Sequence, residues 1–164
     1  MEETARLVEC AVKEQYEASA SQPAFETLVR DHQDMAYGYA YARVLDPYEA
    51  QDIVQDSLIT VYRKLQTLRN PDAFAPWLRR IVYHECLRHR KSDARDIASS
   101  ELDAVPSHHD DPETEYLRHE TRAEVQRAIG GLTAANRVPI VLYYFNGYSQ
   151  QQIAELTGLE VATV

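Results

Sequence analysis

The feature that most constrains the fold is a stripe of apolar residues between positions 47 and 68. Its members are Ala50, Ile53, Val54, Leu58, Val61, Leu65 and Leu68. Spacings of three, four and seven residues place side chains on one face of an α-helix, where they can be buried together. Asp46, Pro47 and Glu49 precede the stripe and are typical of a helix start of the D-x-x-E kind. The pattern predicts a long amphipathic helix that begins at Pro47.

Similar stripes occur on both sides of this segment. The first comprises Phe25, Leu28, Val29, Met35, Ala36, Tyr39 and Ala42, and the second, after a break at residues 69–72, comprises Phe74, Trp77, Leu78 and Ile81. Residues 1–23 also have the pattern of a short amphipathic helix, with Leu7, Val8, Ala11 and Val12 on one side. Glycine is scarce and strand-like alternation between turn residues is absent. We therefore predict an all-α protein.

The C-terminal part has its own helix signals. A helix over 114–129 is predicted to stop at Gly130 and Gly131, and a second one, over 134–145, to start after Thr133 as its cap. Pro139 inside the second helix is expected to remove one hydrogen bond and bend the backbone. Ser149 with Gln152 forms a capping-box pattern, and Gly158 is a left-handed stop before a further helix from about Glu160. This succession predicts a helix-turn-helix.

A polar segment separates these two parts. Residues 96–115 contain two prolines, four serines or threonines, a histidine pair and a run of acids, without an apolar period. Such a composition is typical of a linker. We therefore predict an N-terminal extension over 1–23, a helical domain over 24–95, a flexible acidic linker over 96–113 and a small helical domain over 114–164.

The distribution of charge along the chain is more informative about binding partners than the net charge of −9. Residues 96–124 carry nine acidic and two basic side chains, whereas residues 77–95 carry six basic and two acidic ones. Arginine contacts phosphate and aromatic rings stack on unpaired bases, so the basic segment suits melted DNA better than duplex. Its candidate residues are Trp77, Arg79, Arg80, Tyr83, His84, Arg88, Arg90 and Lys91. The alternative is a surface helix whose arginines pair with nearby acids.

Three polar residues share the other face of the predicted helix from Pro47. Asp52, Gln55 and Asp56 lie at spacings of three and four, opposite the apolar stripe. The simplest interpretation is a solvated polar face. A catalytic carboxylate pair would need a concave site and a raised pKa, which an outward helix face does not offer. A docking patch for a basic partner is the third alternative.

Several classes of protein are disfavoured. The longest apolar run has eight residues, from Val138 to Phe145, which is too short to span a membrane, and the N-terminus lacks the pattern of a signal peptide. Cys10 and Cys86 are far apart, and His84, Cys86 and His89 cannot converge on one ion from a helix. No phosphate loop or catalytic motif occurs. We therefore expect a cytoplasmic protein that is not an enzyme and has no metal and no cofactor.

The sequence resembles a known family. The runs FETLVRDHQDMAYGYAYARVLDPYEAQDIVQDSLITVYRKL and DAFAPWLRRIVYHECLRHRK resemble region 2 of bacterial sigma-70 type RNA polymerase sigma factors of the extracytoplasmic-function (ECF) subfamily. The run IGGLTAANRVPIVLYYFNGYSQQQIAELTGLEVATV resembles their region 4. The two resemblances cover residues 24–91 and about 114–164, in the same order as in the family.

The resemblance implies roles for several residues. Asp52, Gln55 and Asp56 match the acidic signature with which region 2 grips the β′ coiled coil of core RNA polymerase. The residues implied in holding the single-stranded minus-10 promoter element are Arg69, Asn70, Phe74, Trp77, Arg79, Arg80, Tyr83, His84, Arg88 and Lys91. Those implied in reading the minus-35 element are Ser149, Gln150, Glu160 and Thr163. The resemblance also implies an anti-sigma factor as a partner.

The helix before the helix-turn-helix is implied in contact with the β flap of the polymerase. It carries Tyr143, Tyr144 and Phe145, of which we expect at least two to be core residues. The family usually has Asn and Asp where this chain has His84 and Arg88, a difference that bears on the minus-10 base preference. The chain ends at Val164 within the implied recognition helix, so we expect this region 4 to be incomplete and its minus-35 reading weak.

These features predict an ECF-type sigma factor that binds core RNA polymerase, recognises a promoter and helps to melt it. The first alternative is a sigma-like interaction module that an anti-sigma factor binds, without productive promoter recognition. The second is a hydrolase that uses Asp52 and Asp56, for which no further sequence signal exists.

Overall fold

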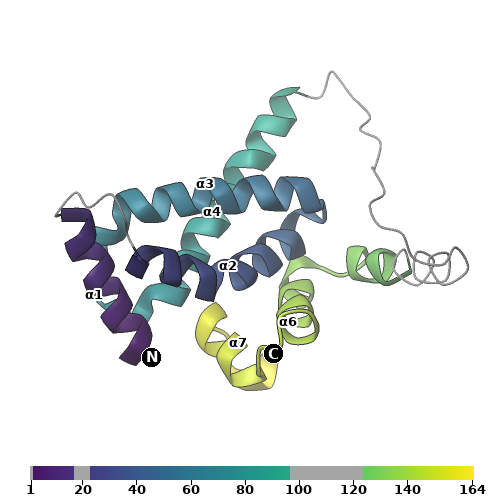
Figure 1. The fold of residues 1–164 in the computed structure, drawn as a ribbon. Coiled ribbons are helices and arrows are strands. Elements are labelled where there is room, and N and C mark those ends of the chain that lie inside the picture. Colours follow the sequence, from purple (N-terminus) through teal and green to yellow (C-terminus); the bar gives the residue numbers. More distant parts are fainter. Residues whose placement is uncertain (1, 17–22, 97–123) are drawn as a thin grey trace, which may run out of the picture.

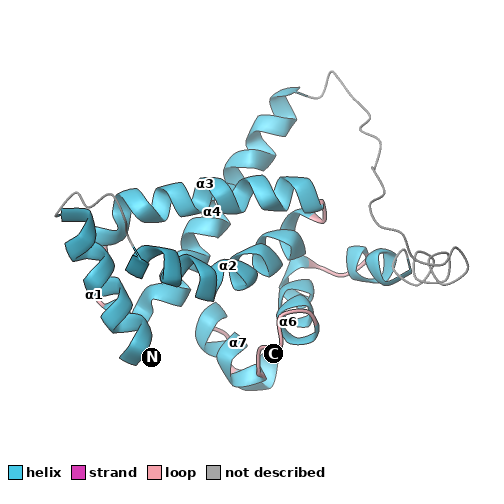
Figure 2. Cartoon of the chain, in the orientation of Figure 1, coloured by secondary structure: helices cyan, strands magenta, loops and turns pink. Residues whose placement is uncertain are grey.

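The computed structural model describes residues 2–16, 23–96 and 124–164 (Figure 1). The α-helices are α1 (Glu2–Tyr16), α2 (Pro23–Val44), α3 (Pro47–Lys64), α4 (Phe74–Asp96), α6 (Ala134–Tyr144) and α7 (Gln150–Thr157). Residues 124–130 are also helical, and short 3-10 turns occupy Leu65–Thr67, Pro71–Ala73 and Val161–Thr163. Within the described ranges every regular element is a helix (Figure 2). The predicted all-α class is therefore confirmed.

Helix α3 begins as its sequence predicts. The Asp46 carboxylate accepts a hydrogen bond of 2.7 Å from the backbone N–H of Glu49, and Pro47 is the first helical residue. Ala50, Ile53, Val54, Val61 and Leu65 of the stripe are buried, and Leu58 and Leu68 pack against the core from partly buried positions. The α-helix ends at Lys64, and the stripe continues through a 3-10 turn.

Helices α2, α3 and α4 pack against one another around this stripe. On α4 the fully buried side chains are Phe74, Leu78, Val82 and Cys86, whereas Trp77 and Ile81 are only partly buried. The sequence placed Ile81 inward and left out Val82. The buried residues of α4 follow one another at intervals of four positions, rather than at alternating intervals of three and four. This row of side chains faces α2 and α3.

Helix α1 belongs to the same helical unit, although the sequence suggested a separate extension. Its Val8 and Ala11 are buried in the common core. The Glu14 carboxylate accepts a hydrogen bond of 3.2 Å from the backbone N–H of Ala24, near the N-terminus of α2, where a negative charge is favourable. The Gln15 amide donates to the backbone carbonyl of Tyr62 at 2.7 Å. These contacts tie α1 to both α2 and α3.

Helices α6 and α7 begin and end close to the predicted residues, whereas the helix predicted from about Glu160 is a 3-10 turn over Val161–Thr163. The start of the helix predicted over 114–129 lies outside the described residues. Ser149 and Gln152 form a reciprocal capping box, and Gly158 adopts a left-handed conformation with φ of 77°. Thr133 occupies the N-cap position of α6, but its hydroxyl makes no capping hydrogen bond, contrary to the prediction. Helix α6 continues through the buried Pro139 to Tyr144.

The C-terminal helices lie against the N-terminal ones. Helix α6 packs on α2, and α7 packs on α4 and α6 (Figure 1). Ile129, Val138, Val141, Leu142, Ile153 and Leu156 share one apolar core with α1 to α4. The predicted linker over 96–113 lies outside the described residues except for Asp96, the last residue of α4.

The two cysteines are expected to differ sharply in reactivity. Cys10 is exposed, whereas Cys86 is buried and its burial raises the pKa of the thiol to about 11. Because the thiolate is the reactive form, one thiol should react rapidly with a disulfide reagent at pH about 8, and the second only after unfolding. A time course of thiol release checks this, with Cys10→Ser as the control that should abolish the rapid phase. Equal reaction rates for the two thiols would contradict the packing of α4.

Candidate functional site

The polar face of α3 is the first candidate surface. Asp52 and Gln55 are exposed, as the helix periodicity predicted. The Asp56 carboxylate is instead engaged within the chain: its Oδ2 lies 2.7 Å from Arg88 Nη2 and 3.3 Å from His89 Nε2. Two of the three predicted docking residues therefore present their side chains to solvent, and the third also connects α3 to α4.

Around Asp56 a small polar cluster joins the two helices. Arg88 Nη2 also lies 2.8 Å from the carboxylate of Glu85, which is largely buried. The hydroxyl of Thr60 on α3 donates to Glu85 Oε1 at 3.3 Å. These contacts join the C-terminal half of α4 to α3. They therefore link the polar face of α3 to α4, the helix that the sequence predicts to bind DNA.

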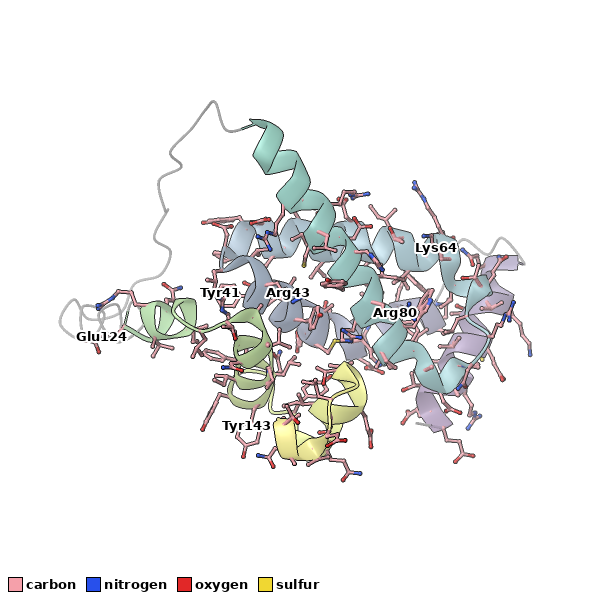
Figure 3. All side chains as sticks on the ribbon, turned by 180° about the vertical axis from the view of Figure 1, so that it is seen from behind. Tyr41, Arg43, Lys64, Arg80, Glu124 and Tyr143 are labelled. Atoms are coloured by element: carbon pink, nitrogen blue, oxygen red, sulfur yellow. The ribbon has the colours of Figure 1, made fainter. Side chains whose placement is uncertain are left out.

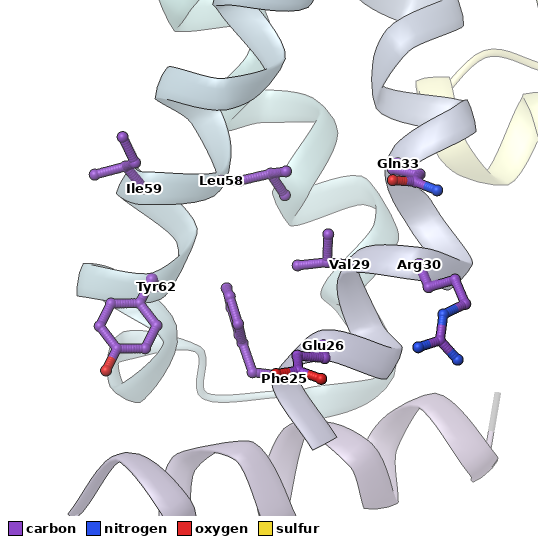
Figure 4. A pocket seen from close by; sticks show the side chains of 8 residues that line it. All are labelled: Phe25, Glu26, Val29, Arg30, Gln33, Leu58, Ile59 and Tyr62. Atoms are coloured by element: carbon purple, nitrogen blue, oxygen red, sulfur yellow. The ribbon is translucent and has the colours of Figure 1, made fainter. Parts of the chain in front are cut away.

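A hollow of about 650 Å³ opens between α2 and α3 (Figure 4). Its lining is mainly apolar and consists of Phe25, Glu26, Val29, Arg30, Gln33, Leu58, Ile59 and Tyr62. The rings of Phe25 and Tyr62 meet edge to face with centroids 5.2 Å apart, and half of Ile59 is exposed. Ile59 and Tyr62 follow Gln55 by four and seven positions, so the hollow continues the polar face along α3. Sequence reasoning missed this hollow, although the same spacing could have indicated it.

The basic face of α4 is the second candidate surface. Arg80 and His84 are exposed one turn apart, and Arg88 follows one turn later on the same face. Arg80 is labelled on α4 in the view from behind (Figure 3). Arg69 and Asn70 are exposed just before the helix, where the Asn70 side chain accepts from the backbone N–H of Asp72 at 3.2 Å. Arg80, His84 and Arg88 therefore share one exposed face of α4, and Arg69 and Asn70 are exposed in the segment that precedes the helix.

Two other residues implied in DNA binding, Arg79 and Tyr83, contact side chains of α2. Arg79 donates a hydrogen bond of 3.2 Å to the hydroxyl of Tyr39, and Arg43 stacks on the ring of Tyr83 at 4.4 Å. Both Arg79 and Tyr83 are half-buried. In this structure, Arg79 and Tyr83 connect α4 to α2. The side chain of Lys91 lies outside the described residues, although its backbone is helical.

Phe74 carries two expectations, a core position from the apolar stripe and a DNA contact from the resemblance, and the structure places it in the core. Its exposed fraction is 2%, and its ring meets His32 edge to face with centroids 4.9 Å apart. The carbonyl of Leu28 accepts from His32 Nδ1 at 3.0 Å, and burial lowers the pKa of this histidine. The ring of Trp77, 6.1 Å from that of Phe74, is partly buried beside it. A base cannot stack on Phe74 unless the core opens.

The predicted minus-35 residues lie at the start of α7 and in the segment that follows it. Ser149 is occupied in the capping box, and Gln150 is the first exposed residue of the helix. Glu160 and Thr163 are exposed at the two ends of the last 3-10 turn.

The prediction that two of three aromatic residues on α6 are core residues is wrong. Tyr143, Tyr144 and Phe145 are 47%, 76% and 61% exposed. Helix α6 buries Val138, Val141 and Leu142 instead, and it ends at Tyr144 before another turn can bring Phe145 inward. An exposed aromatic group of this size marks a contact surface.

Within residues 2–16, 23–96 and 124–164, no three histidine, cysteine or acidic side chains are placed to hold a metal ion. None of the helices in these ranges is sufficiently long and apolar to cross a membrane.

Two parts of the chain match models of known protein families. Residues 28–96 match the family description Sigma-70 region 2, and residues 122–164 match Sigma-70, region 4. The ECF RNA polymerase sigma factor SigE of Mycolicibacterium smegmatis is 31% identical over 88% of this chain and 57% of its own length. The RNA polymerase sigma-H factor of Pseudomonas aeruginosa is also 31% identical, over 86% of this chain and 78% of its own length. The chain thus spans little more than half the length of the SigE relative.

A solved structure has a similar fold. A chain in the structure of CnrH in complex with the cytosolic domain of CnrY superposes with a TM-score of 0.61 and 26% sequence identity, over 98% of this chain and 86% of the matched one. The two matched regions, their order and the relatives agree with the resemblance seen in the sequence. The chain therefore belongs to the sigma-70 family of RNA polymerase sigma factors, in its ECF subfamily.

Proposed function

We propose that this chain acts as an ECF sigma factor: it binds core RNA polymerase, recognises a promoter and helps to melt it, without catalysing a reaction itself. The observation that carries the proposal is the arrangement of region 2. An acidic and apolar face on α3 and a basic face on α4 are fixed to each other by the Asp56, Arg88 and Glu85 cluster. One rigid unit thus offers a protein-docking face and a DNA-binding face, and the cytoplasm, where polymerase and DNA meet, is its place of action.

The α3 face is the proposed docking site for the β′ coiled coil. Asp52 and Gln55 are exposed, and the apolar hollow with Ile59 and Tyr62 lies next to them. A basic and partly apolar helix pair fits such a surface, because the carboxylate attracts it and the hollow buries its apolar side chains.

The α4 face is the proposed site for the single-stranded minus-10 element. Arg69, Arg80 and His84 are exposed and Trp77 is partly so, which offers two guanidinium groups for phosphates, an imidazole for a hydrogen bond and a ring for a base. Arg79, Tyr83, Arg88 and Lys91 complete the proposed contacts once the strand is bound.

Region 4 would supply two further contacts. The exposed Tyr143, Tyr144 and Phe145 suit an apolar partner surface, which we assign to the β flap. The proposed minus-35 contacts are Ser149 and Gln150 at the start of α7 and Glu160 and Thr163 in the segment after it. CnrH is bound to the cytosolic domain of another protein, and we include an inhibitory protein of this kind, an anti-sigma factor, among the proposed partners.

The DNA part of the proposal is tested with single-stranded oligonucleotides and the complex of this chain with core polymerase. Arg80→Ala should lower the affinity and reduce the slope of log affinity against log salt by about 0.7, the value for one lost phosphate contact on a single strand. Lys13→Ala removes an exposed cation from α1 and should leave the slope unchanged. Fluorescence anisotropy across a salt series measures both variants, with core polymerase alone as the blank. An unchanged slope for Arg80→Ala would remove α4 as the DNA-binding face.

A further inference from the structure

The connecting segment, residues 65–73, joins the proposed docking helix α3 to the proposed DNA-binding helix α4. Arg69 and Asn70, at its middle, are exposed. The regular structure of the segment consists of two short 3-10 turns, Leu65–Thr67 and Pro71–Ala73. A 3-10 turn has poorer hydrogen-bond geometry than an α-helix and extends over few residues. The position of Arg69 therefore depends on groups outside the segment.

Helix α1 provides a surface on which the connecting segment packs. It contacts both 3-10 turns and α4, and it lies beside the end of α3 (Figure 1). Val8 and Ala11 of α1 are buried in the same core as Leu65, the first residue of the segment, and Phe74, which follows its last residue. Helix α1 therefore supports both ends of the connecting segment.

A single side-chain amide connects α1 to the point where the segment leaves α3. The last four carbonyls of an α-helix lack a donor within the helix, and in α3 they include that of Tyr62. Gln15 Nε2 donates to this carbonyl at 2.7 Å, and Gln15 Oε1 accepts from Gln66 Nε2 at 3.3 Å. The Gln15 amide thus joins the end of α3 to the first 3-10 turn. Because this requires a donor and an acceptor together, neither a leucine nor a carboxylate can replace it.

Further hydrogen bonds of the segment are local. The N–H of Leu68 donates to the carbonyl of Leu65 at 3.1 Å, and the N–H of Ala73 donates to the carbonyl of Asn70 at 3.0 Å. Such bonds close each turn, but they do not determine the angle between the turn and α3. Since Gln66 lies only three positions before Arg69, a change of direction at Gln66 displaces the Arg69 side chain.

The Gln15 contacts have more influence on binding than on folding. Both hydrogen bonds lie at the surface, where water competes for the same groups, so they add little to the stability of the whole chain. A segment that is already held in its bound conformation, however, loses less conformational entropy when a ligand binds. The direction that Gln15 gives to the connecting segment therefore affects the affinity for a ligand of Arg69.

We propose that Gln15 is a positioning residue for recognition of the single-stranded minus-10 element. Its amide sets the direction in which the connecting segment leaves α3, and the segment then presents Arg69 to the strand. This inference rests on the proposed function for the identity of the strand, whereas the link between Gln15 and the segment can be tested in the free chain.

The first test measures hydrogen exchange of backbone amides in the free chain by nuclear magnetic resonance. Gln15→Leu has a similar size but removes the donor and the acceptor. The amides of Leu68 and Ala73 should exchange about tenfold faster in this variant, the factor that corresponds to one lost hydrogen bond, while those of α6 keep their rates. The matched control is Lys13→Leu, which introduces leucine at an exposed position of the same helix and should change none of these rates.

The second test measures recognition by the complex of this chain with core polymerase. The probe is a pool of single-stranded DNA of random sequence, from which the strands bound by the parent complex are enriched and sequenced. Gln15→Leu should lower the affinity for the enriched strand by about tenfold, because the connecting segment must then be ordered on binding. The slope of log affinity against log salt should stay unchanged, because no phosphate contact is removed. Arg80→Ala, by contrast, lowers this slope.

Two further variants identify the bond that is responsible. Gln15→Glu has the same size and still accepts from Gln66, but it cannot donate to the Tyr62 carbonyl, so it should lose as much affinity as Gln15→Leu. Gln66→Leu removes the longer bond alone, and combining it with Gln15→Leu should cause no further loss. Full affinity of Gln15→Glu, or a further loss in the pair, would overturn the connection through the Gln15 amide.

The remaining outcomes separate this inference from the proposed function. Unchanged exchange of Leu68 and Ala73 in Gln15→Leu overturns the positioning role, and so does a lower salt slope, which would indicate a lost phosphate contact instead. If the parent complex enriches a sequence and Gln15→Leu binds it equally well, the inference fails and the proposed function stands. If the parent complex enriches no sequence, the proposed function fails, and the exchange rates alone decide whether Gln15 positions the segment.

Discussion

Replacing Arg137 with methionine is expected to lower the free energy of unfolding by about 3 kcal/mol, the largest effect of any single change considered for this chain. Arg137 is buried, and its guanidinium donates to four backbone carbonyls. Methionine fills similar space but leaves these acceptors without their donor. For a domain of this size the melting temperature should fall by about 10 °C, which far-UV circular dichroism measures.

Two variants serve as controls for this prediction. Arg127→Met changes an exposed arginine in the preceding helix and should shift the free energy of unfolding by less than about 0.5 kcal/mol. Arg137→Lys keeps the charge but cannot reproduce the planar set of donors, so an intermediate loss is expected. A loss below about 1 kcal/mol for Arg137→Met would show that these hydrogen bonds do not hold the C-terminal helices in place.

Reversing the charge of Asp52 is expected to weaken the binding of core polymerase by about 100-fold while the melting temperature stays nearly constant. Asp52 is exposed on α3 beside Gln55 and the apolar hollow, and the structure shows no partner for its carboxylate among the described residues. An exposed charge contributes little to folding. An arginine opposite a basic partner costs several kcal/mol of binding free energy, which corresponds to this loss in affinity.

The matched control is Glu124→Arg, the same reversal at an exposed residue on a different helical segment, 124–130 (Figure 3). Titration of labelled core polymerase with each variant measures the dissociation constant. We choose Asp52 over Asp56, because Asp56 also pairs with Arg88 and its replacement would disturb the α3 to α4 cluster. Equal affinity of Asp52→Arg and the parent chain would remove α3 as the docking face.

The helices of region 2 could be predicted from the sequence because their signals are local. The capping residue, the proline at the first position and the apolar stripe of α3 all lie within one segment, and the structure follows them. The stop at Gly158 and the capping box at Ser149 are local for the same reason. Such signals depend on hydrogen bonds and backbone angles that a few neighbouring residues determine.

The buried face of a helix is harder to predict from the sequence when apolar and polar residues do not separate onto two faces. On α4 the apolar stripe correctly included Phe74 and Leu78, but it placed Ile81 inward where the structure buries Val82. Tyr143, Tyr144 and Phe145 appeared to be core residues because aromatic residues usually are, yet α6 ends before it can bury them. In both cases the neighbouring helices, rather than the segment itself, decide which side is covered.

The contacts between the two regions could not be predicted at all. The side-chain amide of Asn146 donates a hydrogen bond to Asp34, and the two residues are 112 positions apart. The acceptor is a backbone carbonyl, which every residue type has, so the sequence gives no sign of it. The four acceptors of Arg137 are likewise backbone groups.

A footprint of unpaired bases tests whether this chain directs core RNA polymerase to open DNA at promoters. Core polymerase and the chain are incubated with a library of bacterial DNA fragments, retained complexes are isolated, and unpaired thymines are mapped with permanganate. One short reactive segment is expected in each selected fragment, present only with the chain and strongly reduced for Asp52→Arg. Core-bound complexes that never contain unpaired thymines, or the same reactive segments without the chain, would contradict this expectation.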